Sequence, residues 1–284
     1  MIAFVFPGQG SQAAGMGRGL FDEVREYARV EREVDALVGY SMRKLCLEDS
    51  GSLLKQTQYT QPCLYVVNAL HYYNAVQEGA RAAFLAGHSL GEFNALLAAE
   101  VFDFLTGLRL VKKRGELMSQ ARGGTMAAVV GTPQARVAEL LCENGLTALD
   151  LANFNTRTQS VLSGPEADIG RAKTVFERAG ATVYVLPVSA AFHSRYVAGA
   201  AQGFAEFLAP MKFGVPRTTV IANVTAEPYP TENASEGVKS LLVRQITSSV
   251  RWTQSIRYLM SLGVTEFKEL GPGAVLTRLI RQIA

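Results

Sequence analysis

The segment Gly87-His88-Ser89-Leu90-Gly91 has the spacing G-x-S-x-G, which presents a reactive serine on a sharp turn. An apolar run at 82–86 precedes it and predicts a buried strand, and a helical pattern at 91–100 follows it. The glycines permit the tight turn, and the helix N-terminus directs free N–H groups toward a developing oxyanion. An ordinary glycine-framed turn is the alternative, but this context favours Ser89 as a nucleophile. Glu92 is expected to complement the helix dipole rather than to act as an acid.

A serine nucleophile needs a base that accepts its proton, and the chain has three histidines. His71 lies within a helical pattern and is expected to be structural. His88 lies in the turn itself, where its side chain is expected to point away from the serine. His193 follows the serine in the chain, as in α/β-hydrolase-like sites, and we predict that it is the base; a hydrogen-bonded core histidine is the alternative. No Asp or Glu is an evident third member, so a backbone carbonyl is a candidate for orienting the imidazole.

A glycine-rich loop, Gly8-Gln9-Gly10-Ser11-Gln12, follows the apolar run 2–6 at the start of the chain. Such a loop at the carboxyl end of a strand lets backbone N–H groups approach a ligand closely. It lacks the lysine of a P-loop, and Ala13 occupies the place of the third glycine of a dinucleotide-binding fingerprint. We therefore expect Gln9 to provide a donor to an oxyanion rather than to a phosphate.

One arginine lies on the apolar face of a predicted helix. The helical pattern 103–121 places Arg114 in the middle of an apolar stripe formed by Leu110, Val111, Leu117 and Met118. An inward guanidinium costs several kcal/mol unless it is paired. One explanation is snorkelling or an internal salt bridge, and the other is a preformed fork for a substrate carboxylate. Near a serine acyl site, the second explanation predicts an acyl group that carries a free carboxylate.

Composition excludes several classes of protein. The 284 residues are 48% hydrophobic and 19% charged, which is typical of a folded globular chain. The net charge of +3 is small for nucleic-acid binding, and no Cys/His pair has the spacing of a zinc site. No apolar run is long enough to span a membrane, and the start of the chain lacks the basic segment of a signal peptide. Three widely separated cysteines are typical of a reducing cytoplasm.

The order of the predicted elements indicates an α/β fold. In the first part, the buried strands 2–6 and 82–86 alternate with helical patterns at 20–38, 60–78, 91–100 and 103–121, which favours a parallel sheet. In the middle, strands are expected at 126–131, 149–154, 160–164 and 182–186, with helices at 133–143 and 166–179. This β-α-β-β-α-β order is that of a ferredoxin-like unit. We predict a main domain of 1–124 and 191–284 with a small domain, 125–190, inserted; 226–235 is expected to be a surface loop.

Short motifs along the whole chain resemble those of one family, the malonyl-CoA:acyl-carrier-protein transacylases and polyketide-synthase acyltransferases. They are FPGQGSQ at 6–12, TQP at 60–62, GHSLGE at 87–92, RLVKKRGELM at 109–118, AAFHS at 190–194, LVRQ at 242–245 and GPGAVLT at 271–277. No single motif is decisive, but the combination is highly specific. The resemblance implies an α/β-hydrolase-like domain with a ferredoxin-like insertion, which agrees with the order of elements above.

The resemblance also implies a reaction and a set of roles. Ser89 would take the acyl group from CoA as an ester, with His193 as general base and then acid, and Arg114 would pair with the malonyl carboxylate. The backbone N–H groups of Gln9 and Leu90 would form the oxyanion hole. The backbone carbonyl of Gln245 would orient the histidine. Gln61, His88 and Phe192 are the further residues implied for the pocket. The acyl group would then pass to the phosphopantetheine thiol of an acyl carrier protein, without a metal or a redox cofactor.

Phe192, directly before the histidine, is similar to the residue of malonyl-selective polyketide acyltransferases, and its bulk would crowd a 2-methyl branch. The chain carries no ketosynthase or carrier, so it is expected to be a discrete, trans-acting acyltransferase that serves polyketide synthase modules in the cytoplasm. The housekeeping malonyl transacylase of fatty-acid synthesis is the alternative within the family.

Two functions outside transfer use part of the same residues. A hydrolase of the same fold would use Ser89 and His193 with water as the acceptor and would clear acyl chains from carriers. Such relatives tend to lack the carboxylate-binding arginine, so Arg114 favours transfer. An inactive scaffold that docks a carrier is disfavoured because the serine, the histidine and the arginine are all intact.

Overall fold

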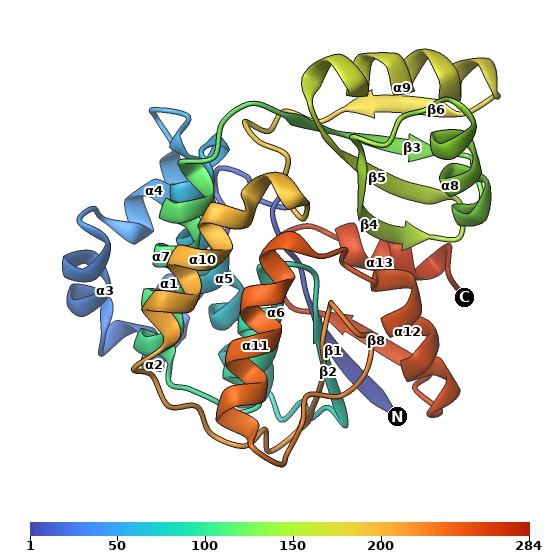
Figure 1. Ribbon diagram of the computed structural model, residues 1–284. Coiled ribbons are helices and arrows are strands. Elements are labelled where there is room, and N and C mark those ends of the chain that lie inside the picture. The colour runs from blue at the N-terminus through green and yellow to red at the C-terminus, as the bar shows by residue number, and fades with distance from the viewer.

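The computed structural model describes residues 1–284, and its strands form two separate sheets (Figure 1). The first is parallel and has the order β7-β2-β1-β8, with strands β1 (Ile2–Phe6), β2 (Phe84–Gly87), β7 (Thr219–Ile221) and β8 (Glu266–Glu269). The second is antiparallel and has the order β4-β5-β3-β6, with strands β3 (Thr125–Val130), β4 (Asp150–Thr156), β5 (Gln159–Gly164) and β6 (Thr182–Val185). The prediction of an α/β fold with a parallel sheet is confirmed.

Helices surround both sheets. Before the second sheet they are α1 (Leu20–Glu23), α2 (Arg25–Ala28), α3 (Glu31–Val38), α4 (Met42–Glu48), α5 (Thr57–Gln77), α6 (Gly91–Ala98) and α7 (Phe104–Ser119), with a 3₁₀ turn η1 (Leu53–Lys55). Within and after it they are α8 (Gln134–Glu143), α9 (Glu166–Arg178), α10 (Ala198–Leu208), α11 (Ala234–Thr247), α12 (Trp252–Ser261) and α13 (Val275–Arg281), with a 3₁₀ turn η2 (Arg195–Val197). None of these helices has both the length and the apolar character that a membrane crossing requires.

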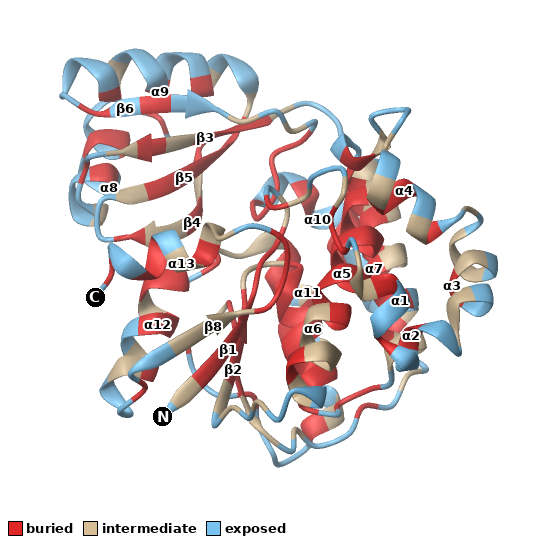
Figure 2. Ribbon diagram, turned by 180° about the vertical axis from the view of Figure 1, so that it is seen from behind, coloured by how far each residue is buried: buried red, intermediate tan, exposed pale blue.

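The parallel sheet is buried on both faces, as Figure 2 shows for β1 and β2. Alternate residues of β1 enter different apolar clusters, because side chains alternate across a strand. Phe4 and Phe6 pack toward the helices α5, α6, α7, α10 and α11. Ala3 and Val5 pack toward α12 and α13 on the other face. A third cluster fills the space between the antiparallel sheet and the helices α8 and α9. Burial on both faces explains why β1 is a continuous apolar run.

The helical segment expected over 20–38 is interrupted in the structure. It forms three short helices, α1, α2 and α3. The break between α1 and α2 lies at Val24, which is extended with φ −86° and ψ 101°, and the break between α2 and α3 lies at Arg29 and Val30. Val24 is fully buried. Burial of this β-branched side chain therefore overrides the helical periodicity of the segment.

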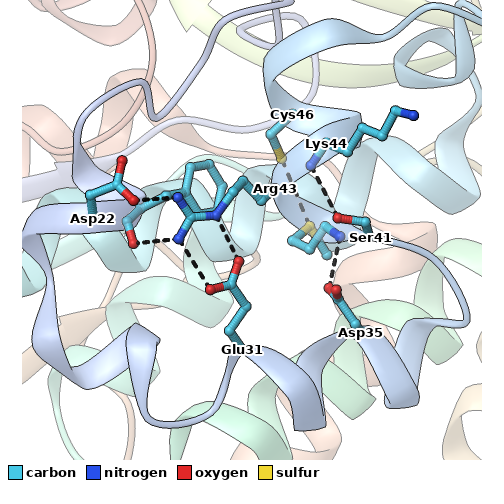
Figure 3. A network of polar contacts seen from close by, with 9 residues as sticks. Asp22, Glu31, Asp35, Ser41, Arg43, Lys44 and Cys46 are labelled. Carbon is cyan, nitrogen blue, oxygen red and sulfur yellow. Dashed lines mark hydrogen bonds and ion pairs between the residues drawn. The ribbon is translucent and has the colours of Figure 1, made fainter.

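A polar network connects these short helices (Figure 3). The Arg43 guanidinium in α4 donates to Glu31 Oε1 at 2.7 Å and to the Phe21 carbonyl at 3.0 Å, and it also contacts Asp22. The Met42 N–H donates to Asp35 Oδ1 at 2.8 Å. One arginine thus joins α1, α3 and α4, which are too short to be stable helices by themselves.

The turn after β2 depends on close backbone contact between glycines. Residues Phe6 and Gly87 are partners in the register of β1 and β2, so the loops that follow both strands lie at the same edge of the sheet. A Cβ atom on Gly87 would lie 1.9 Å from the Gly91 carbonyl carbon, and one on Gly91 would lie 2.0 Å from the Phe6 oxygen. The glycines of the G-x-S-x-G segment are therefore required because backbone occupies the space of a side chain.

We expect Gly91→Ala to lower the free energy of unfolding by about 3 kcal/mol or more, since the added methyl group meets immobile backbone. Gly199→Ala is the matched control, because Gly199 also lies in the first turn of a helix and a Cβ atom there meets nothing within 4 Å. The control should be neutral or raise stability by up to about 1 kcal/mol. Urea unfolding of both variants measures the difference, and equal stabilities would contradict the steric argument.

Candidate active site

Ser89 lies in the turn between β2 and α6 with a positive φ of 51°. This left-handed conformation is rare for a residue with a side chain and marks a strained position. The Asn223 side chain holds it, because Oδ1 accepts from the Ser89 N–H at 2.7 Å and Nδ2 donates to the Gly87 carbonyl at 2.6 Å. Asn223 follows β7, which pairs with β2. The sheet register therefore brings Asn223 next to the turn that presents the serine.

His193 reaches the serine from the segment that follows the second sheet. Its Nε2 atom lies 2.8 Å from Ser89 Oγ, and its Nδ1 atom lies 2.8 Å from the backbone oxygen of Gln245. The carbonyl can only accept, so Nδ1 carries the proton and Nε2 is free to accept from the serine hydroxyl. The loop around His193, whose φ is 55°, is attached to β5 because Ser163 Oγ donates to the Phe192 carbonyl at 2.7 Å.

The electrostatic surroundings keep His193 neutral. Burial and, to a smaller extent, the positive charge of Arg114 lower the pKa of His193 to about 3, although the hydrogen bond to Gln245 acts in the opposite direction. At neutral pH the imidazole is therefore unprotonated, which is the form that can accept a proton from Ser89. No carboxylate contacts the ring, and the orienting group is a backbone carbonyl.

Arg114 is 1% exposed and points into the same site. Its guanidinium donates to Gln61 Oε1 at 2.7 Å, to Gln245 Oε1 at 2.8 Å and to Ser89 Oγ at 3.2 Å. It also lies 5.7 Å from the centre of the Phe93 ring. No carboxylate is within 4.0 Å of it, so neither snorkelling nor a direct salt bridge explains its inward position. Burial lowers the pKa of Arg114 to about 10, and the group remains a cation at neutral pH.

A cavity of about 100 Å³ adjoins these groups. Its lining includes Gln9, Gln61, His88, Ser89, Leu90, Arg114, Met118, Met126, Phe192 and His193. The backbone N–H groups of Gln9 and Leu90 have no acceptor within the protein, so they can donate to a ligand oxygen beside the serine. The Gln9 side chain donates to Thr57 Oγ1 at 3.4 Å. One cavity therefore combines a nucleophile, a base, two free amide donors and a buried cation.

The other histidines have different surroundings. His88 Nε2 lies 3.0 Å from Asn155 Oδ1, and its ring contacts the Trp252 ring with centroids 5.6 Å apart. It borders the cavity but makes no hydrogen bond with the serine hydroxyl. His71 lies within α5 and outside the cavity lining. The structure thus brings together Ser89, His193 and the remaining predicted site residues around one cavity, except Gln245, which lies behind Arg114 and His193.

Glu92, Asn223 and Tyr229 belong to the site, but the sequence gives no distinct signal for them. Glu92, expected to be an ordinary charge near a helix N-terminus, is 0% exposed and accepts from Tyr229 and Asn223 at 2.7 and 3.0 Å. The segment 226–235, expected to be a surface loop, includes Tyr229, which is only 4% exposed. That expectation is therefore wrong for Tyr229, because its hydroxyl reaches a buried carboxylate. The only feature of the sequence that could have indicated burial here was the aromatic ring of Tyr229 within the otherwise polar segment 226–235.

We expect Arg114→Met to raise the pKa of His193, because a positive charge that lowers it is removed while burial remains. The rate at which a fluorophosphonate labels Ser89 should be flat from about pH 5 to 8 in the wild type. The acid limb of the profile, which lies below that range in the wild type, should move to higher pH in the variant, since the protonated imidazole is no longer a base. Ser89→Ala provides the labelling control. An acid limb that does not move would show that the charge does not reach the histidine.

Comparison with known proteins agrees with this geometry. The family described as "Acyl transferase domain" matches residues 3–283. The chain is 50% identical to the polyketide biosynthesis malonyl CoA-acyl carrier protein transacylase BaeC of Bacillus velezensis, covering 100% of this chain and 96% of the relative. It is 41% identical to the malonyl CoA-acyl carrier protein transacylase of Synechocystis sp., covering 99% and 92%.

A solved structure shows the same likeness in three dimensions. The crystal structure of malonyl CoA-acyl carrier protein transacylase from Burkholderia pseudomallei matches with a TM-score of 0.93 and 49% identity, and the match covers 100% of this chain and 97% of that one. The likeness extends over both sheets, since nearly all of both chains is aligned. The chain therefore belongs to the acyl transferase domain family, in the group of malonyl-CoA:acyl-carrier-protein transacylases.

Proposed function

We propose that this protein transfers a malonyl group from malonyl-CoA to the phosphopantetheine thiol of an acyl carrier protein, through an ester on Ser89. The observation that carries the proposal is the buried Arg114 guanidinium, 3.2 Å from the serine hydroxyl and without a carboxylate partner within 4.0 Å. A cation in this position favours an acyl group that brings its own carboxylate. Family membership supports the same reaction.

In the first half-reaction, Ser89 Oγ attacks the thioester carbonyl carbon while His193 Nε2 takes the hydroxyl proton. The carbonyl oxygen becomes an oxyanion, which the N–H groups of Gln9 and Leu90 stabilise. The carbon–sulfur bond then breaks, and the CoA sulfur leaves with the proton that His193 held. The enzyme keeps the malonyl group as a serine ester, with its carboxylate on Arg114.

The second half-reaction repeats these steps in reverse with another thiol. The carrier's phosphopantetheine sulfur gives its proton to His193 and attacks the ester carbonyl, and the oxyanion forms at the same donors. The bond to Ser89 Oγ then breaks, and the serine takes the proton back from His193. Because acyl groups move between a thioester and an ester without any change of oxidation state, the proposed reaction needs no redox cofactor. The amide donors of Gln9 and Leu90 take the role that a metal ion would have in stabilising the oxyanion.

Two side chains adjust the pocket to the acyl group. Gln61 is buried and bonded to Arg114 at 2.7 Å, so it fixes one side of the guanidinium. Phe192 lines the cavity directly before the base and is 4% exposed. In this position the bulk of its ring would crowd a 2-methyl branch, although one methyl group is worth only about 1–3 kcal/mol of discrimination. We infer a preference for malonyl over methylmalonyl groups.

The partner that we infer is a carrier of a modular polyketide synthase, reached in trans. The identity of 50% to a relative named for polyketide biosynthesis, against 41% to the Synechocystis transacylase, favours this branch over the housekeeping one. Three free cysteines are compatible with the cytoplasm, where we place the reaction.

We also infer the domain division 1–124 with 191–284, and 125–190. The small domain would be ferredoxin-like, because its strands have the spatial order β4-β5-β3-β6 and its two helices pack together in one separate core. The parallel sheet with the serine turn after β2 supports an α/β-hydrolase-like main domain. An isolated segment 125–190 that folds would support the division.

Brief incubation with malonyl-CoA should add one malonyl group to the protein, measured by intact-protein mass spectrometry. The adduct should be absent from Ser89→Ala and should move to added holo-carrier protein. Acetyl-CoA and methylmalonyl-CoA should give weaker adducts, because one lacks the carboxylate and the other carries the extra methyl group. Steady release of CoA without any carrier, and no adduct, would instead identify a hydrolase.

Replacing Arg114 by Ala should lower kcat/KM for malonyl-CoA by roughly 100-fold or more, since charged hydrogen bonds contribute about 1.5–3 kcal/mol each. The rate with acetyl-CoA should be spared, because an acetyl group has no carboxylate to bind. Rapid-quench acylation assays with both thioesters measure the ratio. An equal loss with both would mean that Arg114 supports the structure of the site rather than the choice of substrate.

A further inference from the structure

Glu92 is a fully buried carboxylate that the proposed reaction does not use. It lies in the first turn of α6, three residues after the nucleophile, and is 0% exposed. No lysine, arginine or histidine nitrogen lies within 4.0 Å of it. A buried carboxylate without a direct ionic partner is costly unless hydrogen bonds stabilise its charge.

Three donors surround this carboxylate. The Tyr229 hydroxyl and the Asn223 N–H donate to Oε1 at 2.7 and 3.0 Å, and the Gln245 side-chain amide donates to Oε2. All three contacts require an acceptor, which favours the ionised form. The same partners hold the site, because Asn223 binds the Ser89 N–H and the Gln245 carbonyl binds His193.

The Gln245 amide lies between two buried charges of opposite sign. Its Oε1 atom accepts from the Arg114 guanidinium at 2.8 Å, and its Nε2 group donates to Glu92 and, at 2.9 Å, to the Ser89 carbonyl. The opposite orientation would set an NH₂ group against the guanidinium and an oxygen against the carboxylate. The charge of Glu92 therefore determines which end of the amide faces Arg114.

We propose that Glu92 is a positioning residue for malonyl transfer: its ionised carboxylate orients the Gln245 amide, which in turn holds the Arg114 guanidinium beside Ser89. It is also the nearest buried negative charge that compensates Arg114 when no acyl group occupies the cavity. The inference rests on the proposed function, since only an acyl group with a carboxylate depends on where Arg114 lies. Glu92 touches no reacting atom, so it acts through the side chains that it binds, and of these Gln245 is the one that contacts Arg114.

Glu92→Gln tests the charge while keeping the shape of the side chain. Its NH₂ group would face the NH₂ group of Gln245, so the Gln245 amide should turn and Arg114 should lose its position. We expect kcat/KM for acylation by malonyl-CoA to fall at least about tenfold, and that for acetyl-CoA to stay within about threefold. Glu269→Gln is the matched control, because Glu269 also accepts three hydrogen bonds, all from α13, and it should change neither value by more than about threefold.

The outcomes separate the inference from the function beneath it. A wild-type protein that forms no malonyl ester on Ser89 overturns both. If the wild-type protein does form the ester, but a folded Glu92→Gln variant has an unchanged ratio of kcat/KM for malonyl-CoA to that for acetyl-CoA, only the role of Glu92 is overturned. A lowered ratio in Glu92→Gln, with the ratio of Glu269→Gln unchanged, supports it.

If Glu92→Gln does not fold, the wild-type protein decides the question through pH. Burial raises the pKa of Glu92 to about 7, against the donors Tyr229 and Gln245 that lower it, so the carboxylate loses its charge as the pH falls. Arg114, His193 and Tyr229, which face this network, do not change charge between about pH 5 and 8, because their pKa values are about 10, about 3 and raised well above 10. His88, which borders the same cavity, has its pKa lowered by burial, which favours its neutral form. The malonyl-to-acetyl ratio should fall as the pH is lowered through that range, and a constant ratio overturns the inference.

Discussion

The rest of this site depends on one constraint: the charged guanidinium of Arg114 is buried, and therefore desolvated, beside the Ser89 hydroxyl. Arg114 is buried within the helix α7 and stays charged at neutral pH. Its hydrogen bonds to Gln61 and Gln245, from α5 and α11, and its contact with Phe93 replace part of the lost hydration. The four helices α5, α6, α7 and α11 must therefore meet around this guanidinium, and the cation remains incompletely paired until an anionic acyl group arrives.

This charge explains why the site orients its histidine with a carbonyl. A carboxylate next to His193 would lie close to Arg114 as well and would compete with the acyl carboxylate for it. The backbone oxygen of Gln245 fixes the tautomer without adding a negative charge. The nearest negative charge, Glu92, is kept one amide away from the guanidinium. The base stays neutral and the cation stays available to the substrate.

The two sheets contribute different halves of the chemistry. The parallel sheet presents the serine and, through the register of β1 and β2, brings the free N–H group of Gln9 next to that of Leu90. The antiparallel sheet holds the loop of His193 through Ser163, and its residue Met126 lines the cavity. Because residues of the antiparallel sheet and of the loops that follow β1 and β2 line the cavity, a change in the relative position of the sheets would separate the base from the nucleophile.

Local pattern was sufficient for part of this protein. The glycine spacing around Ser89, the strand before it and the helix after it follow from steric limits on a few adjacent residues, so the sequence predicted the turn. The inward position of Arg114 likewise follows from helical periodicity. The motifs of the family supplied Gln245, which no local pattern marks. The helices α1 to α3 were predicted as one, and at least the break between α1 and α2 escaped local pattern, because the burial of Val24 is decided by contacts distant in sequence.

The chain by itself thus determined the α/β order, the serine turn and the presence of a cation on an apolar face. Only the tertiary structure decided that Tyr229, from a segment resembling a surface loop, bonds to Glu92, and that Glu92 faces Gln245 rather than water. The physical reason is that burial and hydrogen-bond partners arise where α6, α11 and the segment after β7 converge. The helix α6 lies more than a hundred residues before the other two segments in the sequence, so periodicity along the chain carries no record of their contact.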